Sequence, residues 1–154
     1  MTTAFDVPPD LLIERAAGVL KAGGKIAPPA WATYARTGVH TENAPRQPDW
    51  WFRRLAAVLR KAYDLGPIGT SRMASEFGGK RDDGSAPYHP RSGSRSIIRE
   101  CLQQLETLGL VAKAEAKGRR VTPAGRKMLD DLAHQILIEL AAKNPELTKY
   151  ARPK

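Results

Sequence analysis

The 154-residue sequence has one cysteine, Cys101, and only three histidines, which lie far apart in the chain. A single cysteine excludes an internal disulfide bond, and these few residues indicate no cysteine or histidine zinc cluster. This low cysteine content fits the reducing cytoplasm, where disulfide bonds are rare. We therefore expect a fold that needs neither a metal ion nor a cofactor.

Long apolar runs and catalytic motifs are missing as well. No apolar run approaches the roughly 20 residues of a membrane-spanning helix, and the beginning of the sequence does not resemble a signal peptide. Asp82 and Asp83 are adjacent carboxylates in a polar segment, but no Ser–His–Asp set or phosphate-binding glycine motif accompanies them. We expect a soluble cytoplasmic protein that makes no membrane contact and is not an enzyme.

Aromatic residues make up only 6% of the chain, whereas hydrophobic residues make up 42%. These values allow one modest core built mainly from aliphatic side chains, and the length suits one domain. We expect a single domain over residues 1–154, with a short C-terminal extension from about residue 144. Since its apolar stripes suffice for one core, the free protein should be a monomer.

Positive charge is abundant and unevenly distributed. The chain carries 25 Lys and Arg residues against 16 Asp and Glu residues, a net charge of +9. Residues 46–127 contain 17 of the basic and 8 of the acidic residues, and the rest of the chain is neutral. A phosphate-binding surface explains this concentration better than general solubility does, so the charge favours a nucleic-acid partner.

Apolar residues at helical spacing predict most of the secondary structure. The longer helices should begin near Pro9, Trp50, Ser94 and Pro123, with Asp49, Ser94 and Thr122 as N-caps. One shorter helix should begin at Pro28 and Pro29, and another should have Thr70 or Ser71 as its N-cap. Residues 110–121 predict a short hairpin with a basic tip. The order of these elements indicates a mainly α fold, a winged-helix-like helical bundle with a short β-hairpin wing.

The helix that begins at Trp50 has two separate faces. One face is apolar and should be buried, with Trp51, Leu55, Val58, Leu59 and Ala62. The opposite face carries candidate phosphate-binding residues, namely Arg53, Arg54, Arg60 and Lys61. The alternative is an ordinary solvated helix surface, on which acidic residues usually neutralise the basic ones. Here Asp64 is the only carboxylate that we expect within reach of these four side chains, so binding is favoured. We therefore expect the substitutions Arg54→Glu and Arg60→Glu to weaken RNA binding strongly and to leave the thermal stability of the protein nearly unchanged.

Trp50 falls beside the basic residues in the helical projection, where it could stack on a base or pack as a second core tryptophan. The wing has a similar double interpretation. The basic residues at its tip are Lys117, Arg119 and Arg120. They could contact a nucleic-acid backbone or form an ordinary charged surface.

Residues 79–93 show no sustained apolar period, and we expect an irregular loop that is mobile in the free protein. Its glycines and basic residues suit close approach to RNA, although a merely flexible surface loop is the alternative. The candidate RNA-binding residues of this segment and of the helix that follows it are Lys80, Arg81, Tyr88, His89, Arg91, Ser94, Arg95 and Arg99.

Four segments resemble a known family when they are read in order: WFRRLAAVLRKAY, SRMASEFGGKRDDG, RSGSRSIIRECLQQLETLGLV and GRRVTPAGRKMLDDLA. Together they resemble the S-nineteen-e family of small-subunit ribosomal proteins in archaea and eukaryotes, over about residues 11–150. The Thr-Pro-x-Gly start is common among winged helices, whereas the aromatic and basic helix followed by Gly-Gly-Lys-Arg and Ser-Gly-Ser-Arg-Ser is distinctive. The C-terminal residues are more similar to archaeal members.

The resemblance implies a non-catalytic place in the head of the small subunit, on its 3′ major domain rRNA and beside neighbouring ribosomal proteins. It also implies a role in subunit maturation. The family's surface pattern falls here on Trp50, Arg54, Arg60, Gly78, Gly79, Lys80, Ser94, Arg95 and Arg99. One departure is Glu100, which follows Arg99 where family members often keep a second basic residue.

The alternative function is that of a DNA-binding winged-helix transcription regulator, which would share the wing, the last helix and the positive charge. Such regulators join their second and third helices by a short turn. The long segment between Phe77 and Ser94 would displace that groove-reading geometry.

Overall fold

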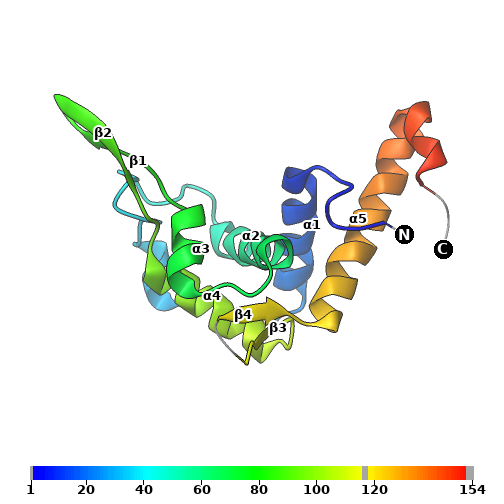
Figure 1. Ribbon diagram of the computed structural model, residues 1–154, viewed down its shortest axis with the longest axis horizontal. Helices are drawn as coiled ribbons and strands as arrows, with labels where there is room; N and C mark the ends of the chain where they lie inside the picture. The colour runs from blue at the N-terminus through cyan, green and yellow to red at the C-terminus, as the bar shows by residue number, and fades with distance from the viewer. Residues whose placement is uncertain (1, 116–117, 152–154) are drawn as a thin grey trace.

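The structure is a computed structural model, and it describes residues 2–115 and 118–151. These residues form five α-helices and two β-hairpins, arranged as shown in Figure 1. In chain order they are α1 (Pro9–Ala22), α2 (Trp50–Leu65), α3 (Thr70–Glu76), β1 (Gly79–Asp83), β2 (Ala86–Arg91), α4 (Arg95–Thr107), β3 (Val111–Lys113), β4 (Arg119–Val121) and α5 (Pro123–Lys143). Short 3-10 helices follow α1 and α5, at Ala30–Thr33 and Pro145–Lys149. The predicted winged-helix-like fold with a β-hairpin wing is confirmed.

Helix α2 lies at the centre of the fold, in contact with α1, α4 and α5. Its predicted apolar face is buried, and Phe52 and Ala56 are buried too, because neighbouring helices cover α2 on more than one side. The indole N–H of Trp51 donates a hydrogen bond to Gln104 Oε1 at 2.9 Å, which satisfies the polar atom of this core side chain. The burial of α2 holds its remaining, basic face in a fixed orientation.

Two of the four predicted N-caps are present. Ser94 Oγ accepts from the backbone N–H of Ile97 at 3.4 Å, and Thr122 Oγ1 accepts from that of Gly125 at 3.2 Å. The other two predictions are wrong: α3 begins at Thr70 after Gly69 and has no side-chain cap, and the Asp49 side chain makes no capping hydrogen bond. Its carboxylate accepts instead from Arg53 Nε, one helical turn further on.

The buried face of α4 includes the single cysteine. Cys101 is fully buried beside Ile98 and Leu102, and burial raises the pKa of its thiol to about 12. The thiol is therefore protonated at neutral pH and packs as a small apolar side chain.

Strands β3 and β4 form the wing, and the backbone attaches them to the chain before α3. Ile68 and Arg119 exchange two backbone hydrogen bonds of 2.9 and 3.0 Å. A Cβ at Gly118 would approach the Ile68 carbonyl group within 2.7 Å, and the φ of Gly118 is +80°. Glycine is therefore required at this close approach.

The expectation of an irregular loop over residues 79–93 is wrong. Strands β1 and β2 pair antiparallel, and Gly84, with a φ of +72°, turns the chain between them. Figure 1 shows this hairpin projecting away from the helices. Since all of β2 and most of β1 are exposed, neither face needs apolar residues, and the alternation that reveals a half-buried strand is absent.

Close backbone contacts hold the base of the β1–β2 hairpin. The backbone N–H of Gly93 donates to Ala74 O, and that of Ser94 donates to Thr37 O, both at 2.9 Å. A Cβ at Gly78 would overlap the carbonyl oxygen of Arg91. The hairpin thus leaves the helical body in a direction that its contacts with α3 and the 37–41 loop define.

Candidate nucleic-acid interface

The β1–β2 hairpin presents basic and aromatic side chains to solvent. Lys80 and Arg91 are exposed and have no carboxylate partner among the described residues, and Tyr88 is 59% exposed. Arg81 is partly neutralised, because its Nε lies 3.0 Å from Asp83 Oδ1. The exposed hairpin therefore carries three cations against the two carboxylates of Asp82 and Asp83, with the ring of Tyr88 in β2.

A polar hollow of about 550 Å³ lies where α3 and α4 begin. Arg95 and Arg99 lie one turn apart on α4, and both are exposed without an ion pair to any residue that the structure describes. The other residues that line the hollow all carry hydroxyl groups, namely Thr70, Ser71, Ser94 and Ser96. Guanidinium and hydroxyl groups together offer several donors to an anion such as a phosphate.

Two of the four candidate phosphate-binding residues on α2 already have acidic partners. Arg53 contacts Asp49 and Glu14, each at 3.1 Å, and Lys61 Nζ lies 2.9 Å from Glu76 Oε2. The hydrogen bond from Arg53 lowers the pKa of Asp49. The expectation that this face lacks nearby carboxylates is therefore wrong, and these two cations are partly neutralised.

The other two, Arg54 and Arg60, are half-buried and are not free surface residues. The Arg54 guanidinium carbon lies 4.5 Å from the ring centroid of Phe77, a cation–π contact. Burial lowers the pKa of this guanidinium group. The buried Nε of Arg60 has no hydrogen-bond partner in the structure. The partial burial of both side chains differs from the fully solvent-exposed basic face that the helical projection predicts.

Trp50 lies at the boundary between the core and the surface. Its ring packs edge-to-face against Trp51, with centroids 5.3 Å apart, at the margin of the core. It also lines a groove of about 530 Å³ together with Arg53, Arg54 and Phe77. The ring therefore supports the core and remains accessible from the groove.

The wing contributes less free charge than the sequence indicated. Arg119 is mostly buried, with its side chain 18% exposed, and its Nε lies 3.0 Å from Glu106 Oε2. Arg120 is exposed, whereas Lys117 lies outside the described residues. Within the described part of the wing, only Arg120 is an exposed basic candidate.

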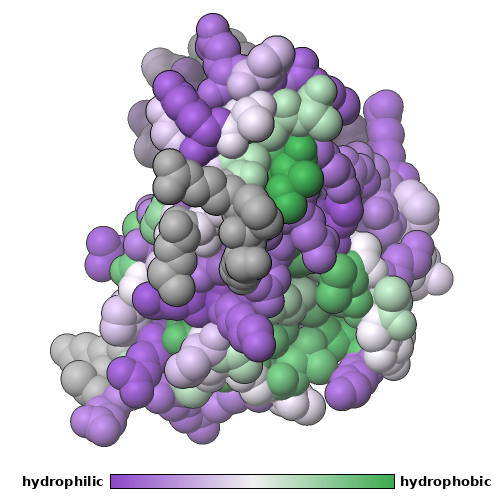
Figure 2. All heavy atoms as spheres, turned by 90° about the vertical axis from the view of Figure 1, so that its right-hand side faces the viewer, coloured by the Kyte–Doolittle hydropathy of each residue, from purple (hydrophilic) through white to green (hydrophobic). Residues whose placement is uncertain are grey.

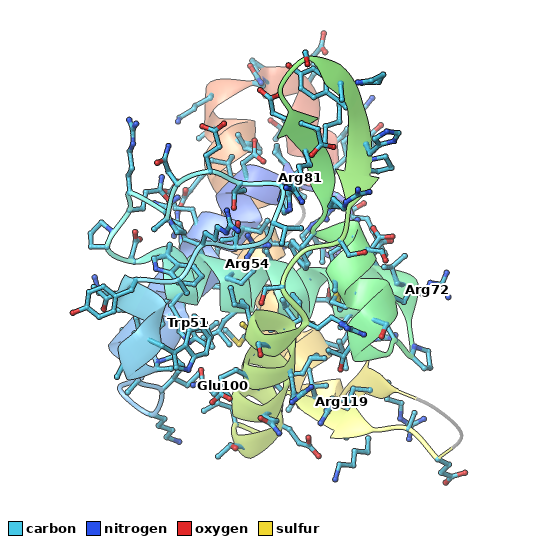
Figure 3. All side chains as sticks on the ribbon, turned by 90° about the vertical axis from the view of Figure 1, so that its left-hand side faces the viewer. Trp51, Arg54, Arg72, Arg81, Glu100 and Arg119 are labelled. Carbon is cyan, nitrogen blue, oxygen red and sulfur yellow. The ribbon has the colours of Figure 1, made fainter. Side chains whose placement is uncertain are left out.

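Figure 3 shows from one side the elements that carry basic side chains, with Arg81 on the hairpin, Arg54 on α2 and Arg119 on the wing. The sequence analysis missed Arg72, which is exposed on α3 in the same view, and the hydroxyl groups of Thr70 and Ser71. These residues belong to a helix that is too short for a clear periodic pattern. Only the packing of α3 against α4 brings them close to Arg95.

The face that carries α1 and α5 has a different character. Figure 2 shows hydrophobic residues gathered there among hydrophilic ones. An apolar hollow of about 500 Å³ lies between the two helices, and its lining includes Leu11, Val19 and Ile136. The Arg15–Glu139 ion pair, with a distance of 2.7 Å, bridges the same helices. This face is therefore suited to protein contacts more than to phosphate groups.

Two further classes of site find no support in the described parts of the chain. Residues 2–115 and 118–151 contain no group of three His, Cys, Asp or Glu residues that could hold a metal ion. No helix in these residues is sufficiently long and apolar to span a membrane.

The chain is similar to known proteins over most of its length. Residues 3–139 match the family described as Ribosomal protein S19e. The chain belongs to this family. It is 46% identical to the small ribosomal subunit protein eS19 of Aeropyrum pernix, over 97% of this chain and 99% of the relative. The eS19 protein of Haloarcula marismortui is 43% identical over 98% of this chain and 100% of its own. The eS19A protein of Schizosaccharomyces pombe is 37% identical over 87% of this chain and 93% of its own.

The family match confirms the resemblance seen in the sequence. Its members in archaea and eukaryotes are named as ribosomal proteins, which are not a class of enzymes or of transcription regulators. The hairpin between α3 and α4 also differs from the short turn of a helix-turn-helix regulator.

Proposed function

We propose that this protein is a structural constituent of the small ribosomal subunit in the cytoplasm. In this role it binds rRNA of the subunit head, in the 3′ major domain, and supports subunit assembly and maturation without catalysis. The assignment to the ribosome follows from membership of the S19e family. The assignment to the head and to maturation rests on the family resemblance.

The observation that carries RNA binding is the set of unpaired cations around the hairpin and the polar hollow. Lys80, Arg91, Arg95 and Arg99 are exposed and have no carboxylate partner in the described chain. Phosphate binding by such cations is more favourable than binding by paired ones, because no internal ion pair must be broken first. The hairpin projects beyond the helical body and can enter an RNA groove or junction. The polar hollow can hold a phosphate between Arg95 and Arg99.

Neighbouring ribosomal proteins are the partners that we assign to the α1 and α5 face. Its apolar hollow and the exposed side chains of Leu11 and Val19 suit a protein surface. We expect the free protein to be a monomer because the buried residues already form one core around α2.

Sedimentation of the native protein in a cell lysate tests this proposal. We expect it to comigrate with small subunits and to remain bound after a high-salt wash. Chromatography of the purified protein should show a monomer. Exclusive migration as a free dimer that binds duplex DNA would contradict the proposal and favour a regulator.

A further inference from the structure

The groove beside Trp50 is built from parts of the chain that lie far apart in sequence. Its walls come from α1, the 37–47 loop, α2 and Phe77 at the end of α3. Apolar surface is provided by Ile13, Pro45, Trp50, Ala57 and Phe77, and polar groups by Thr37, Thr41, Asn43, Gln47, Arg53 and Arg54. It therefore combines aromatic rings with side chains that can donate and accept hydrogen bonds.

The amides at the rim of the groove are available to a ligand. Asn43 and Gln47 are exposed, and their side chains have no hydrogen-bond partner among the described residues. Each amide offers two N–H donors and a carbonyl acceptor, which can match the mixed donor and acceptor edge of a nucleobase. Thr41, in contrast, already donates to Gly38 O at 2.9 Å and helps to hold the loop in place.

The charges in the groove favour an anionic ligand. Arg53 is compensated by Asp49 and Glu14, but Arg54 has no acidic partner in the described residues. Arg54 is held over the ring of Phe77, so its position in the groove wall is fixed before any ligand binds. One immobilised, uncompensated cation next to aromatic surface suits a group that has a flat apolar part and a phosphate.

We propose that this groove binds a single unpaired nucleotide of RNA. The base lies against Trp50, its hydrogen-bonding edge meets the amides of Asn43 and Gln47, and Arg54 contacts the adjoining phosphate. The groove volume of about 530 Å³ falls within the usual range for small-ligand sites. The inference rests on the proposed RNA binding and adds a specific preference, namely for RNA with an extruded base.

The position of the groove agrees with an RNA ligand. Thr37, which lines it, accepts a backbone hydrogen bond from Ser94 at the base of the hairpin. Phe77, which also lines the groove, precedes β1 by two residues. Figure 3 shows Arg54 below the hairpin that carries Arg81, so one RNA segment can contact both features.

The test compares two short RNA hairpins that differ only in one bulged adenosine in the stem. Binding to the full chain is measured for the unchanged protein, for the double variant Asn43→Ala and Gln47→Ala, and for the control Gln135→Ala. Asn43 and Gln47 are exposed, so their replacement should not disturb folding, and Gln135 is exposed on α5. We expect the unchanged protein and the control to bind the bulged RNA about tenfold more tightly than the paired RNA. The double variant should lose this preference and keep its affinity for the paired RNA.

Cross-linking gives a second readout that does not depend on a substitution. A photoreactive 4-thiouridine in place of the bulged adenosine should cross-link to Trp50 or to its neighbours in the groove. Equal affinity for both RNAs, a preference that persists in the double variant, or cross-links confined to the hairpin would overturn the nucleotide site and leave the proposed function intact. Failure to bind either RNA would overturn both the nucleotide site and the proposed RNA binding.

Discussion

Arg54 and Arg99 have the same charge but different surroundings. Arg54 is half-buried against Phe77, whereas Arg99 is exposed at the polar hollow. We predict that Arg54→Glu lowers the free energy of unfolding by roughly 2 kcal/mol, because it removes a cation–π contact and buries an unpaired carboxylate. Thermal denaturation measures the loss, and RNA binding by the same variant should also weaken.

Arg99→Glu is the matched control for this prediction. It makes the same change of charge on an exposed helical position, so the melting temperature should hardly change while RNA binding weakens. Equal melting temperatures for the two variants would show that the contact between Arg54 and Phe77 contributes nothing to stability.

The sequence could not reveal which basic residues on α2 are free. A helical projection placed Arg53, Arg54, Arg60 and Lys61 on one side of α2, but it contains no information about other segments. Glu14 reaches Arg53 from 39 residues away, and Glu76 reaches Lys61 from 15 residues away. The nearer partner, Asp49, was visible at a spacing of four residues, but it was assigned to the N-cap.

Among the elements, the β1–β2 hairpin should be separable from the helical core. Gly79 pairs with Arg91 at its base, so a short glycine linker can replace residues 80–91. Because β2 is fully exposed and β1 mostly so, we predict that this deletion preserves helical content and melting temperature. It should prevent salt-resistant incorporation into small subunits, which sedimentation of the variant measures.

A second variant distinguishes the charge of the hairpin from its shape. Changing Lys80, Arg81 and Arg91 to Gln keeps the strand pairing, which is formed by the backbone. We expect this variant to incorporate less stably than the unchanged protein and better than the deletion. Normal incorporation of the deletion variant would make the hairpin a simple connection and contradict its assigned role.

Prediction of the elements succeeded where burial imposes a pattern. The stripes of α2 and α4 face the core, and their buried residues recur at the spacing that the sequence shows. The β1–β2 hairpin has no such stripe, because no core faces either side of it. The groove was also invisible, since the 37–47 loop that completes it has no periodicity and meets α2 only in the folded chain.

At the scale of the whole molecule, two faces differ in charge and polarity, and the proposed function assigns RNA to one and protein to the other. The excess positive charge lies in residues 46–127, which form the hairpins and the helices around the polar hollow. The first and last helices are close to neutral as a group and enclose the apolar hollow. Because of this division, the protein can hold RNA with one face while another ribosomal protein covers the opposite one.

The division predicts where the salt dependence of RNA binding originates. Each phosphate contact releases counterions, so the slope of log K against log salt should become shallower by about one for each contacting cation that is removed. We predict a shallower slope for the double variant Arg95→Gln and Arg99→Gln, measured on rRNA of the subunit head over a series of salt concentrations. The matched variant Lys21→Gln and Lys25→Gln removes the same charge from exposed positions near the end of α1, and its slope should equal that of the unchanged protein. If both variants lowered the slope equally, net charge alone would attract the RNA, and the polar hollow would have no specific part in binding.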